Sequence, residues 1–337
     1  MKKPIWILLD SQGVGGIESH VINLTKGLID SGYAAEIIFL QRYGDHPLTP
    51  VIEALNIPCT FLSGGLNALR NALRAQPRLL HTHGYKAGIL GRIAARAAGI
   101  PVVSTFHAGE PGVGRVRLYD TLDRWTAFLA PAIAVSDAIA QRIPVASQQF
   151  KNFVTVPATM ASHDSHAIGF VGRFSHEKGA DRFCAFANSY RDAPFIAFGD
   201  GPMLAPLREQ YGALVNFVGA VPSMTSHWEK MSRLCMPSRH EGLPMAALEA
   251  MARGIPVIAS KVGALPQLIV HQDNGWLVDT DDDTGFIAAL KEWDLLTDDQ
   301  QAQMRLKARA TIVDHYSPEA IVPNIVQFYA THFPTAF

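Results

Sequence analysis

The chain of 337 residues is longer than one hydrophobic core usually supports, so two domains are expected. Apolar residues make up 48% and charged residues 18% of it, a composition that excludes a disordered protein. The net charge of −1 argues against a protein that binds polyanions over its whole surface. Three widely separated cysteines, Cys59, Cys184 and Cys235, lack metal-ligand spacing and are typical of a reducing cytosol.

The first apolar run, Ile5 to Leu9, ends at Asp10 and is too short for the core of a signal peptide, so it predicts a buried strand. No apolar run approaches the roughly 20 residues that a membrane-spanning helix needs. We therefore expect a cytoplasmic protein, which can also act at the inner face of the cytoplasmic membrane.

Short apolar runs alternate with helical patterns, which is typical of a parallel sheet with crossover helices. A strand at 4–9 leads into a glycine-rich turn at 11–16 and a helix whose apolar stripe begins at Ile17. Further strands of the first half are expected at 35–40, 79–83, 102–107 and 132–136.

A polar stretch at 157–166 interrupts this alternation and suits a linker. The pattern then resumes, and an amphipathic helix is expected at 318–332. Strands of the second half are expected at 167–171, 195–198, 214–218, 233–236 and 256–259, and Trp276–Val278 is also strand-like. The chain is thus predicted to form two doubly wound α/β domains joined near residue 160, with ligands bound outside the carboxyl ends of the strands.

The first glycine turn, Ser11-Gln-Gly-Val-Gly-Gly-Ile-Glu18, lies between a strand and a helix, as a phosphate-binding turn does. Gly13 and Gly15 match two glycines of the dinucleotide fingerprint, but Glu18 replaces the third. This departure disfavours an NAD(P)-dependent oxidoreductase. A tight turn without a ligand stays open as an alternative.

A second turn, Gly169-Phe-Val-Gly-Arg-Phe-Ser-His-Glu-Lys-Gly179, places Arg173 and Lys178 on its two sides. A guanidinium fork and an ammonium group suit a pyrophosphate, although two solvated surface cations are the alternative. Open glycine turns follow the next two strands at 199–202 and 217–220.

Two carboxylates, Glu241 and Glu249, bracket seven uncharged residues that look like protein core. Pro244 and Gly254 predict a helix over roughly 244–253, so that Glu249 lies in its second turn and Glu241 just before it. A carboxylate that accepts from sugar hydroxyls, beside a helix start that attracts an anion, describes a nucleotide-sugar site.

This segment resembles the Glu-seven-residues-Glu motif of retaining family 4 glycosyltransferases (glycosyltransferase group 1). Four further stretches resemble the family in the same order along the chain: Gly15–Glu18, Val171–Gly179, Gly199–Pro202 and Gly254–Gly263. The resemblance implies the GT-B fold, two facing Rossmann-like domains with a central cleft and a C-terminal crossover helix. It also implies an acceptor-binding domain at 1–160, a nucleotide-sugar-binding domain at 161–316, and a helix at 317–337 that packs back on the first domain.

The resemblance further implies a role for each matching residue. Arg173 and Lys178 would hold the donor diphosphate in place of a metal, Glu241 would contact the donor sugar, and Glu249 would accept from the ribose. His107 is similar to the family's active-site histidine. The implied catalytic residues are Glu241, Lys178, Arg173 and His107; the donor site adds Gly15, Gly16, Gly242, Leu243, Glu249 and Gly219, and the acceptor side His83 and Gly13.

No metal site or cofactor is expected. The acidic run Asp279-Thr-Asp-Asp-Asp283 is better explained as a helix N-cap than as a metal-binding Asp-any-Asp element. Between Arg70 and Arg124, nine basic residues stand against three acidic ones, which suits an anionic membrane or a phosphorylated glycolipid unless acidic residues elsewhere neutralise them. Nucleic acid is not expected, because no binding motif is present.

The function predicted is transfer of a hexose, with retention, from a nucleotide diphosphate donor such as a UDP-sugar. The acceptor would be a glycan or a lipid-linked glycan in bacterial lipopolysaccharide or surface polysaccharide synthesis. Two alternatives remain: a protein of the same fold that binds a nucleotide sugar without transferring it, and the oxidoreductase.

Overall fold

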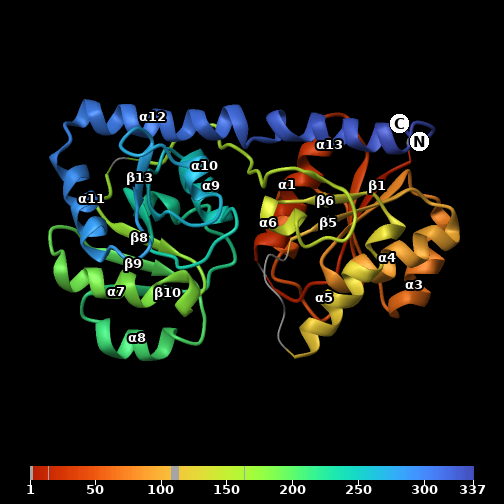
Figure 1. The fold of residues 1–337 in the computed structure, drawn as a ribbon, viewed down its shortest axis with the longest axis horizontal. Coiled ribbons are helices and arrows are strands. Elements are labelled where there is room, and N and C mark those ends of the chain that lie inside the picture. The colour runs from red at the N-terminus through yellow and green to blue at the C-terminus, as the bar shows by residue number, and fades with distance from the viewer. Residues whose placement is uncertain (1–2, 14, 108–113, 163) are drawn as a thin grey trace. The chain divides into compact units, whose positions relative to one another are not determined.

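The computed structural model describes residues 3–13, 15–107, 114–162 and 164–337. The chain divides into two compact units, Met1–Phe153 with Pro318–Phe337, and Val154–Ser317. Each unit is a parallel β-sheet flanked by helices (Figure 1), which confirms the predicted α/β class. The division falls between Phe153 and Val154, a little before the boundary expected near residue 160.

The first unit holds a seven-stranded parallel sheet in the order β3-β2-β1-β4-β5-β6-β7. Its strands are β1 (Ile5–Leu9), β2 (Ala35–Phe39), β3 (Cys59–Phe61), β4 (Leu79–His83), β5 (Val102–Phe106), β6 (Ala132–Ala134) and β7 (Ser147–Gln149). Its helices are α1 (Gly16–Asp30), α2 (Thr49–Ala54), α3 (Gly65–Ala72), α4 (Tyr85–Ala98), α5 (Arg115–Trp125), α6 (Asp137–Ala140) and α13 (Pro318–His332), with 3₁₀ turns η1 (Leu73–Ala75) and η2 (Ala127–Leu129).

Both faces of this sheet are covered, which explains why its strands are apolar throughout rather than alternating. Ile5 and Ile7 of β1 pack in a core with residues of α1 and α13. Trp6 and Leu8 point to the opposite face and pack with residues of α3 and α4.

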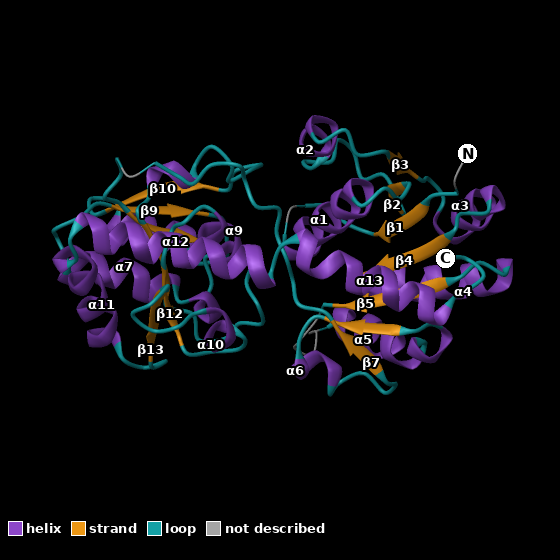
Figure 2. Cartoon of the chain, turned by 90° about the horizontal axis from the view of Figure 1, so that it is seen from above, coloured by secondary structure: helices purple, strands orange, loops and turns teal. Residues whose placement is uncertain are grey.

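Helix α13 packs directly against α1, although the two are almost 300 residues apart in the sequence (Figures 1 and 2). Gly27 of α1 makes the approach possible, because a Cβ at this position would lie 2.7 Å from Cγ2 of Val322. The predicted helix at 318–332 is therefore a part of the first unit.

The second unit holds a six-stranded parallel sheet in the order β10-β9-β8-β11-β12-β13. Its strands are β8 (Ile168–Val171), β9 (Phe195–Phe198), β10 (Val215–Gly219), β11 (Arg233–Met236), β12 (Val257–Ser260) and β13 (Gly275–Val278). Its helices are α7 (Ala180–Ser189), α8 (Leu204–Tyr211), α9 (Met245–Ala252), α10 (Leu265–Leu268), α11 (Asp283–Leu295) and α12 (Asp298–His315), with 3₁₀ turns η3 (His176–Lys178) and η4 (Trp228–Lys230).

The predicted strands agree with the structure to within a residue or two at each end. Strands β3 and β7 were not predicted, because each has only three residues and β7, Ser147-Gln148-Gln149, is entirely polar. Each lies at one edge of the first sheet, where one side of the strand has no neighbouring strand.

Candidate active site

The turns that follow β8, β9 and β10 stack on one another at the carboxyl edge of the second sheet. Backbone hydrogen bonds join Gly172 to Phe198 at 3.1 Å and Gly199 to Gly219 at 2.9 Å. Gly199 has a φ of +129°, and a Cβ there would lie 1.9 Å from the carbonyl oxygen of Gly172. A glycine is required at this position, and the stacked turns leave a surface of backbone groups that a ligand can approach.

Lys178 and Glu241 form the ion pair at the centre of this edge. The Lys178 Nζ donates to Oε2 of Glu241 at 2.7 Å, and the Ser238 hydroxyl donates to Oε1 at 2.8 Å. The Glu241 side chain is only 3% exposed, whereas that of Lys178 is 31% exposed. The carboxylate is thus held by two partners, and the ammonium group keeps an open side from which an anion can reach it.

Arg173 stands at the same turn with its side chain exposed. Glu177 belongs to the same turn. Partial burial raises the pKa of its carboxyl, but a hydrogen bond with Ser175 and the charges of Arg173 and Lys178 contribute to a net lowering. Two cations therefore act on one small region of the sheet edge, as the sequence predicts for a diphosphate site.

Arg239 anchors the loop that carries Glu241, a role that the sequence did not reveal. Its guanidinium group makes two hydrogen bonds to the carboxylate of Asp181, at 2.9 and 2.8 Å. Its backbone N–H donates to the carbonyl of Glu177 at 2.8 Å. The pair Arg239–Asp181 therefore fixes the Glu241 loop against α7, and the backbone hydrogen bond to Glu177 fixes it against η3, which carries Lys178. The only signal in the sequence is that Arg239 begins the segment containing Glu241.

The loop after β12 packs against the loop that carries Glu241. Ala264 donates its N–H to the carbonyl of Gly242 at 2.9 Å. Gly263 has a φ of +56°, and a Cβ there would lie 2.2 Å from the carbonyl oxygen of Glu241. This contact fixes the backbone around Gly242 and the buried Leu243. Gly242 itself has open space beside its Cα.

Glu249 lies in the second turn of α9, on an otherwise apolar helix, as predicted. Burial raises the pKa of the Glu249 carboxyl, and the charge of Arg253 opposes this rise. Pro244 precedes the helix as its N-cap and is not its first residue. The predicted N-cap in the acidic run 279–283 is confirmed, since Asp282 accepts from the N–H of Gly285 at 2.8 Å.

In the first unit, the carboxyl ends of β4 and β5 bring His83 and His107 together. Nδ1 of His83 and Nε2 of His107 are 3.0 Å apart and share a hydrogen bond. His20 of α1 lies beside both, with ring centroids 5.4 and 4.9 Å away. Burial lowers the pKa of His83 and His107 well below the ordinary value and that of His20 to about 4, so all three are neutral.

Neutral imidazoles are also metal ligands, and nitrogen atoms of these three histidines all lie within 4.8 Å of one another. The bond between His83 and His107 already engages one nitrogen of each ring. His81 is committed elsewhere, with Nδ1 2.7 Å from the Tyr329 hydroxyl and Nε2 2.7 Å from that of Thr105. Its role is structural, because it ties β4 to α13.

The glycine turn after β1 lies at the same edge of the first sheet, although its residue Val14 is outside the described part of the chain. Gly15 is the N-cap of α1 and Gly16 its first residue, while Gly13 has open space beside its Cα. Glu18 accepts a hydrogen bond from Ser11 across the turn. The third position of the dinucleotide fingerprint thus carries a side chain that folds back onto the turn.

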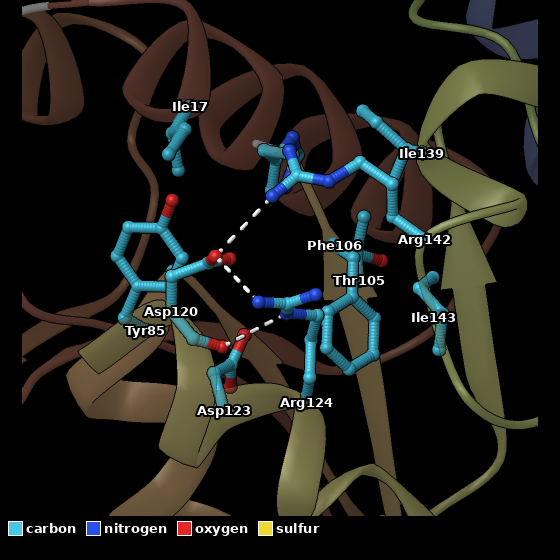
Figure 3. Close-up of a pocket in the computed structure, with 12 residues that line it drawn as sticks. Ile17, Tyr85, Thr105, Phe106, Asp120, Asp123, Arg124, Ile139, Arg142 and Ile143 are labelled. Carbon is cyan, nitrogen blue, oxygen red and sulfur yellow. Dashed lines mark hydrogen bonds and ion pairs between the residues drawn. The ribbon is translucent and has the colours of Figure 1, made fainter. Parts of the chain in front are cut away.

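A pocket that is lined in part by His107 opens to solvent. Figure 3 shows the residues around it. Asp120 lies between Tyr85 and two arginines in this view, 3.1 Å from Arg124 and 3.2 Å from Arg142. Asp123 also lines the pocket and pairs with the buried Arg92 at 2.6 Å, and burial raises its pKa to about 6 despite that charge. The pocket thus combines apolar walls with carboxylate, guanidinium and phenol groups, a mixture that suits a polar organic ligand.

Residues 165–296 match the family model described as "Glycosyl transferases group 1", and residues 14–154 match "Glycosyltransferase Family 4". The chain belongs to this glycosyltransferase family. A phosphatidyl-myo-inositol mannosyltransferase of Mycolicibacterium smegmatis is 26% identical over 94% of this chain and 90% of its own. The UDP-Gal:alpha-D-GlcNAc-diphosphoundecaprenol alpha-1,3-galactosyltransferase of Escherichia coli is 25% identical over 74% of both chains.

Solved structures at low sequence identity share the fold of this chain. Anabaena Alr3699/HepE in complex with UDP-glucose superposes with a TM-score of 0.82, at 20% identity, over 98% of this chain and all of that one. The lipopolysaccharide outer core galactosyltransferase WaaB superposes with a TM-score of 0.67 at 18% identity. The predicted GT-B fold, with two Rossmann-like domains, is therefore confirmed.

The structure brings together two groups of the residues predicted for this glycosyltransferase. One is at the edge of the second sheet and comprises Arg173, Lys178, Gly219, Glu241 and Gly242. The other is at the edge of the first sheet and comprises Gly13, Gly15, Gly16, His83 and His107. Within the described ranges, no helix combines the length and the hydrophobicity needed to cross a membrane.

Proposed function

We propose that this glycosyltransferase moves a hexose, with retention of configuration, from a nucleotide diphosphate donor, in the first instance a UDP-sugar. The observation that carries the proposal is the pair of Lys178 and the buried Glu241, with exposed Arg173 on the same edge. The structure of HepE, which has the same fold and was solved with UDP-glucose bound, supports this choice of donor.

In this proposal Arg173 and Lys178 bind the two phosphates and stabilise the negative charge that grows as the bond from the anomeric carbon to the phosphate oxygen breaks. Cations placed where negative charge grows in the transition state stabilise it electrostatically. They take the part that a divalent metal plays in other sugar transferases, so the reaction needs no metal or other cofactor.

The acceptor hydroxyl attacks the anomeric carbon from the side that the diphosphate leaves. The new carbon–oxygen bond forms as the old one breaks, and the acceptor proton passes to the departing diphosphate oxygen. Retention then follows without a nucleophile from the protein. Glu241 binds hydroxyls of the donor sugar, and Glu249 accepts from the ribose hydroxyls. The family resemblance gives His107 a catalytic role as well.

The acceptor is a glycan or a lipid-linked glycan, and its reactive end binds in the pocket of Tyr85, Asp120 and Arg142. This proposal draws support from the E. coli relative, whose substrate carries diphosphoundecaprenol. We place the reaction in lipopolysaccharide or surface polysaccharide synthesis, at the cytoplasmic face of the membrane.

The experiment is a transfer assay with UDP-sugars and lipid-diphosphate glycans in the presence of EDTA, with the product anomer read by NMR. We expect turnover with one of the UDP-sugars. The new linkage should have the same anomeric configuration as the donor sugar. A product of inverted configuration, or turnover that appears only when a divalent cation is added, would refute this mechanism.

A further inference from the structure

Helix α5 has its acidic and apolar residues on the opposite sides from those expected of a surface helix. Asp120 and Asp123 point into the protein and are 4% and 5% exposed. Leu118 and Trp125, one heptad apart on the other side, are 61% and 71% exposed. An outward apolar face with inward carboxylates calls for a partner other than water.

The neighbouring residues extend this apolar face. Among the described residues, fourteen large apolar side chains are exposed, and six of them fall between positions 116 and 128. These are Val116, Leu118, Tyr119, Leu122, Trp125 and, in η2, Phe128, which is 70% exposed. The other four tryptophans of the chain are at most 7% exposed, so Trp125 is distinct from all of them.

Exposed arginines lie on α5 itself and on the helices that precede it. Helix α4 packs against both α3 and α5. These helices and η1 carry the exposed side chains of Arg70, Arg74, Arg96 and Arg117, none of which has an ion pair within the described ranges. The carboxylates of α5 do not neutralise them, because Asp123 is paired with Arg92, and Asp120 with Arg124 and Arg142.

Within the described part of the basic span, acidic residues therefore neutralise some basic side chains but leave these four arginines unpaired. Lys86 pairs with Asp10 at 3.1 Å, and Arg78 lies over the ring of Phe337, so neither contributes to the face. Residues 108–113 of the span and the side chain of Arg115 lie outside the described residues.

We propose that this surface, Leu118, Trp125 and Phe128 with Arg70, Arg74, Arg96 and Arg117, docks on an anionic lipid bilayer. The apolar side chains enter the interface between head groups and acyl chains, where tryptophan is favoured, and the arginines bind lipid phosphates. We name it the α5 face. An interfacial patch of this kind needs no membrane-spanning helix.

The inward side of α5 also forms a wall of the pocket beside His107, through Asp120, Asp123 and Arg124. Docking by the outer side therefore holds the pocket within one helix diameter, about 10 Å, of the lipid surface. This part rests on the proposed function, and it specifies an acceptor whose lipid stays in the bilayer while its sugar enters the pocket.

The test is sedimentation of the full-length protein with vesicles of phosphatidylglycerol and phosphatidylcholine (1:1), compared with vesicles of phosphatidylcholine alone. We expect binding to the anionic vesicles only, weakened roughly tenfold or more by L118S/W125S and several-fold by R96E/R117E. The matched controls are L295S/L306S and R191E/K291E, which change exposed residues of the second unit and should bind as wild type does.

Fluorescence with brominated acyl chains gives a second readout. Quenching of the wild type should disappear in W125S, and circular dichroism of each variant checks that it folds. Neither measurement uses a donor or an acceptor, so docking is tested independently of transfer. Absence of binding to anionic vesicles, or binding by L118S/W125S equal to that of the wild type, would overturn the proposal. It would also be overturned if the wild type formed a dimer that L118S/W125S dissociates, while neither the wild type nor the variant bound vesicles.

Discussion

The Nζ atom of Lys178 lies 2.7 Å from the carboxylate of Glu241, although 63 residues separate the two in the sequence. Their positions follow from the topology, because β8 and β11 are neighbours in the sheet and the loops after them meet at its carboxyl edge. The carboxylate is buried and the ammonium group partly open, so an incoming diphosphate can share the cation without exposing Glu241 to water.

Replacing Lys178 by Ala should reduce transfer by at least about 100-fold, because a charge-stabilising group of the transition state is lost. It should also lower the free energy of unfolding by about 1–3 kcal/mol, since the buried Glu241 loses its charged partner. The double variant K178A/E241Q should recover much of this stability and none of the activity. Thermal unfolding and initial rates, measured on the same samples, separate the two effects.

A suitable control for stability is K261A, because the pair Lys261–Asp279 is 49% and 76% exposed. Surface pairs of this kind contribute about 0–1 kcal/mol. If K178A were as stable as K261A and as active as wild type, the ion pair would have neither role.

The two glutamates should differ in steady-state kinetics. E241Q should lower kcat, since Glu241 is placed beside the donor sugar, whereas E249Q should mainly raise the KM of the donor by roughly tenfold, the effect of losing charged hydrogen bonds. The raised pKa of Glu249 indicates that the helix tolerates the neutral amide. If E249Q left the KM of the donor unchanged, with normal kinetics for the acceptor, a contact of Glu249 with the ribose would be excluded.

Gly263 should be more sensitive to alanine than another glycine with positive φ. A Cβ at Gly263 would lie 2.2 Å from the backbone of Glu241, whereas Gly99, with a φ of +66°, has open space beside it. G99A should cost about 1–2 kcal/mol from backbone strain alone. G263A should cost more and also lower kcat, because the Glu241 loop must move. Equal losses of stability and full activity in G263A would show that the close approach is unimportant.

Much of this architecture follows from local patterns in the sequence. Strands β9 and β11 and helix α13 match their predicted bounds, because each is a continuous apolar or strongly periodic segment. The sequence pattern also identified the two glycine turns and the charged residues beside them. These features depend on neighbours along the chain, which the sequence displays directly.

The rest depends on contacts between distant segments. Nothing near Arg239 in the sequence points to Asp181, and nothing near His83 points to His107; only the neighbouring positions of the strands bring them together. The apolar face of α5 was missed for a similar reason. Its alternating charged and apolar residues resemble any surface helix until the structure shows that the carboxylates are the buried side.

Acid should destabilise the first unit selectively. Burial lowers the pKa of His20 to about 4 and of His81 to about 3, below the value near 6.5 of an unfolded chain. At pH values between the folded and the unfolded pKa, the unfolded chain binds protons that the folded unit does not. The contribution of these histidines to the free energy of unfolding is therefore complete above about pH 6.5 and decreases as the pH drops. Each histidine should cost about 1 kcal/mol per pH unit.

Hydrogen exchange at pH 7 and pH 5 can follow the two units separately. Protection of β4 and α13 should decrease at pH 5, and much less change is expected in β9 and β12. Equal protection of β4 at both values would mean that these histidines are not buried as neutral groups.

The central claim is that Arg173 and Lys178 bind the donor diphosphate without a metal, and titration calorimetry with UDP in the presence of EDTA tests it most directly. Wild-type protein and the surface control R191A should bind UDP with the same Kd, and R173A/K178A should bind at least about 100-fold more weakly. Equal affinity in R173A/K178A, or binding by the wild type that requires a divalent cation, would contradict it.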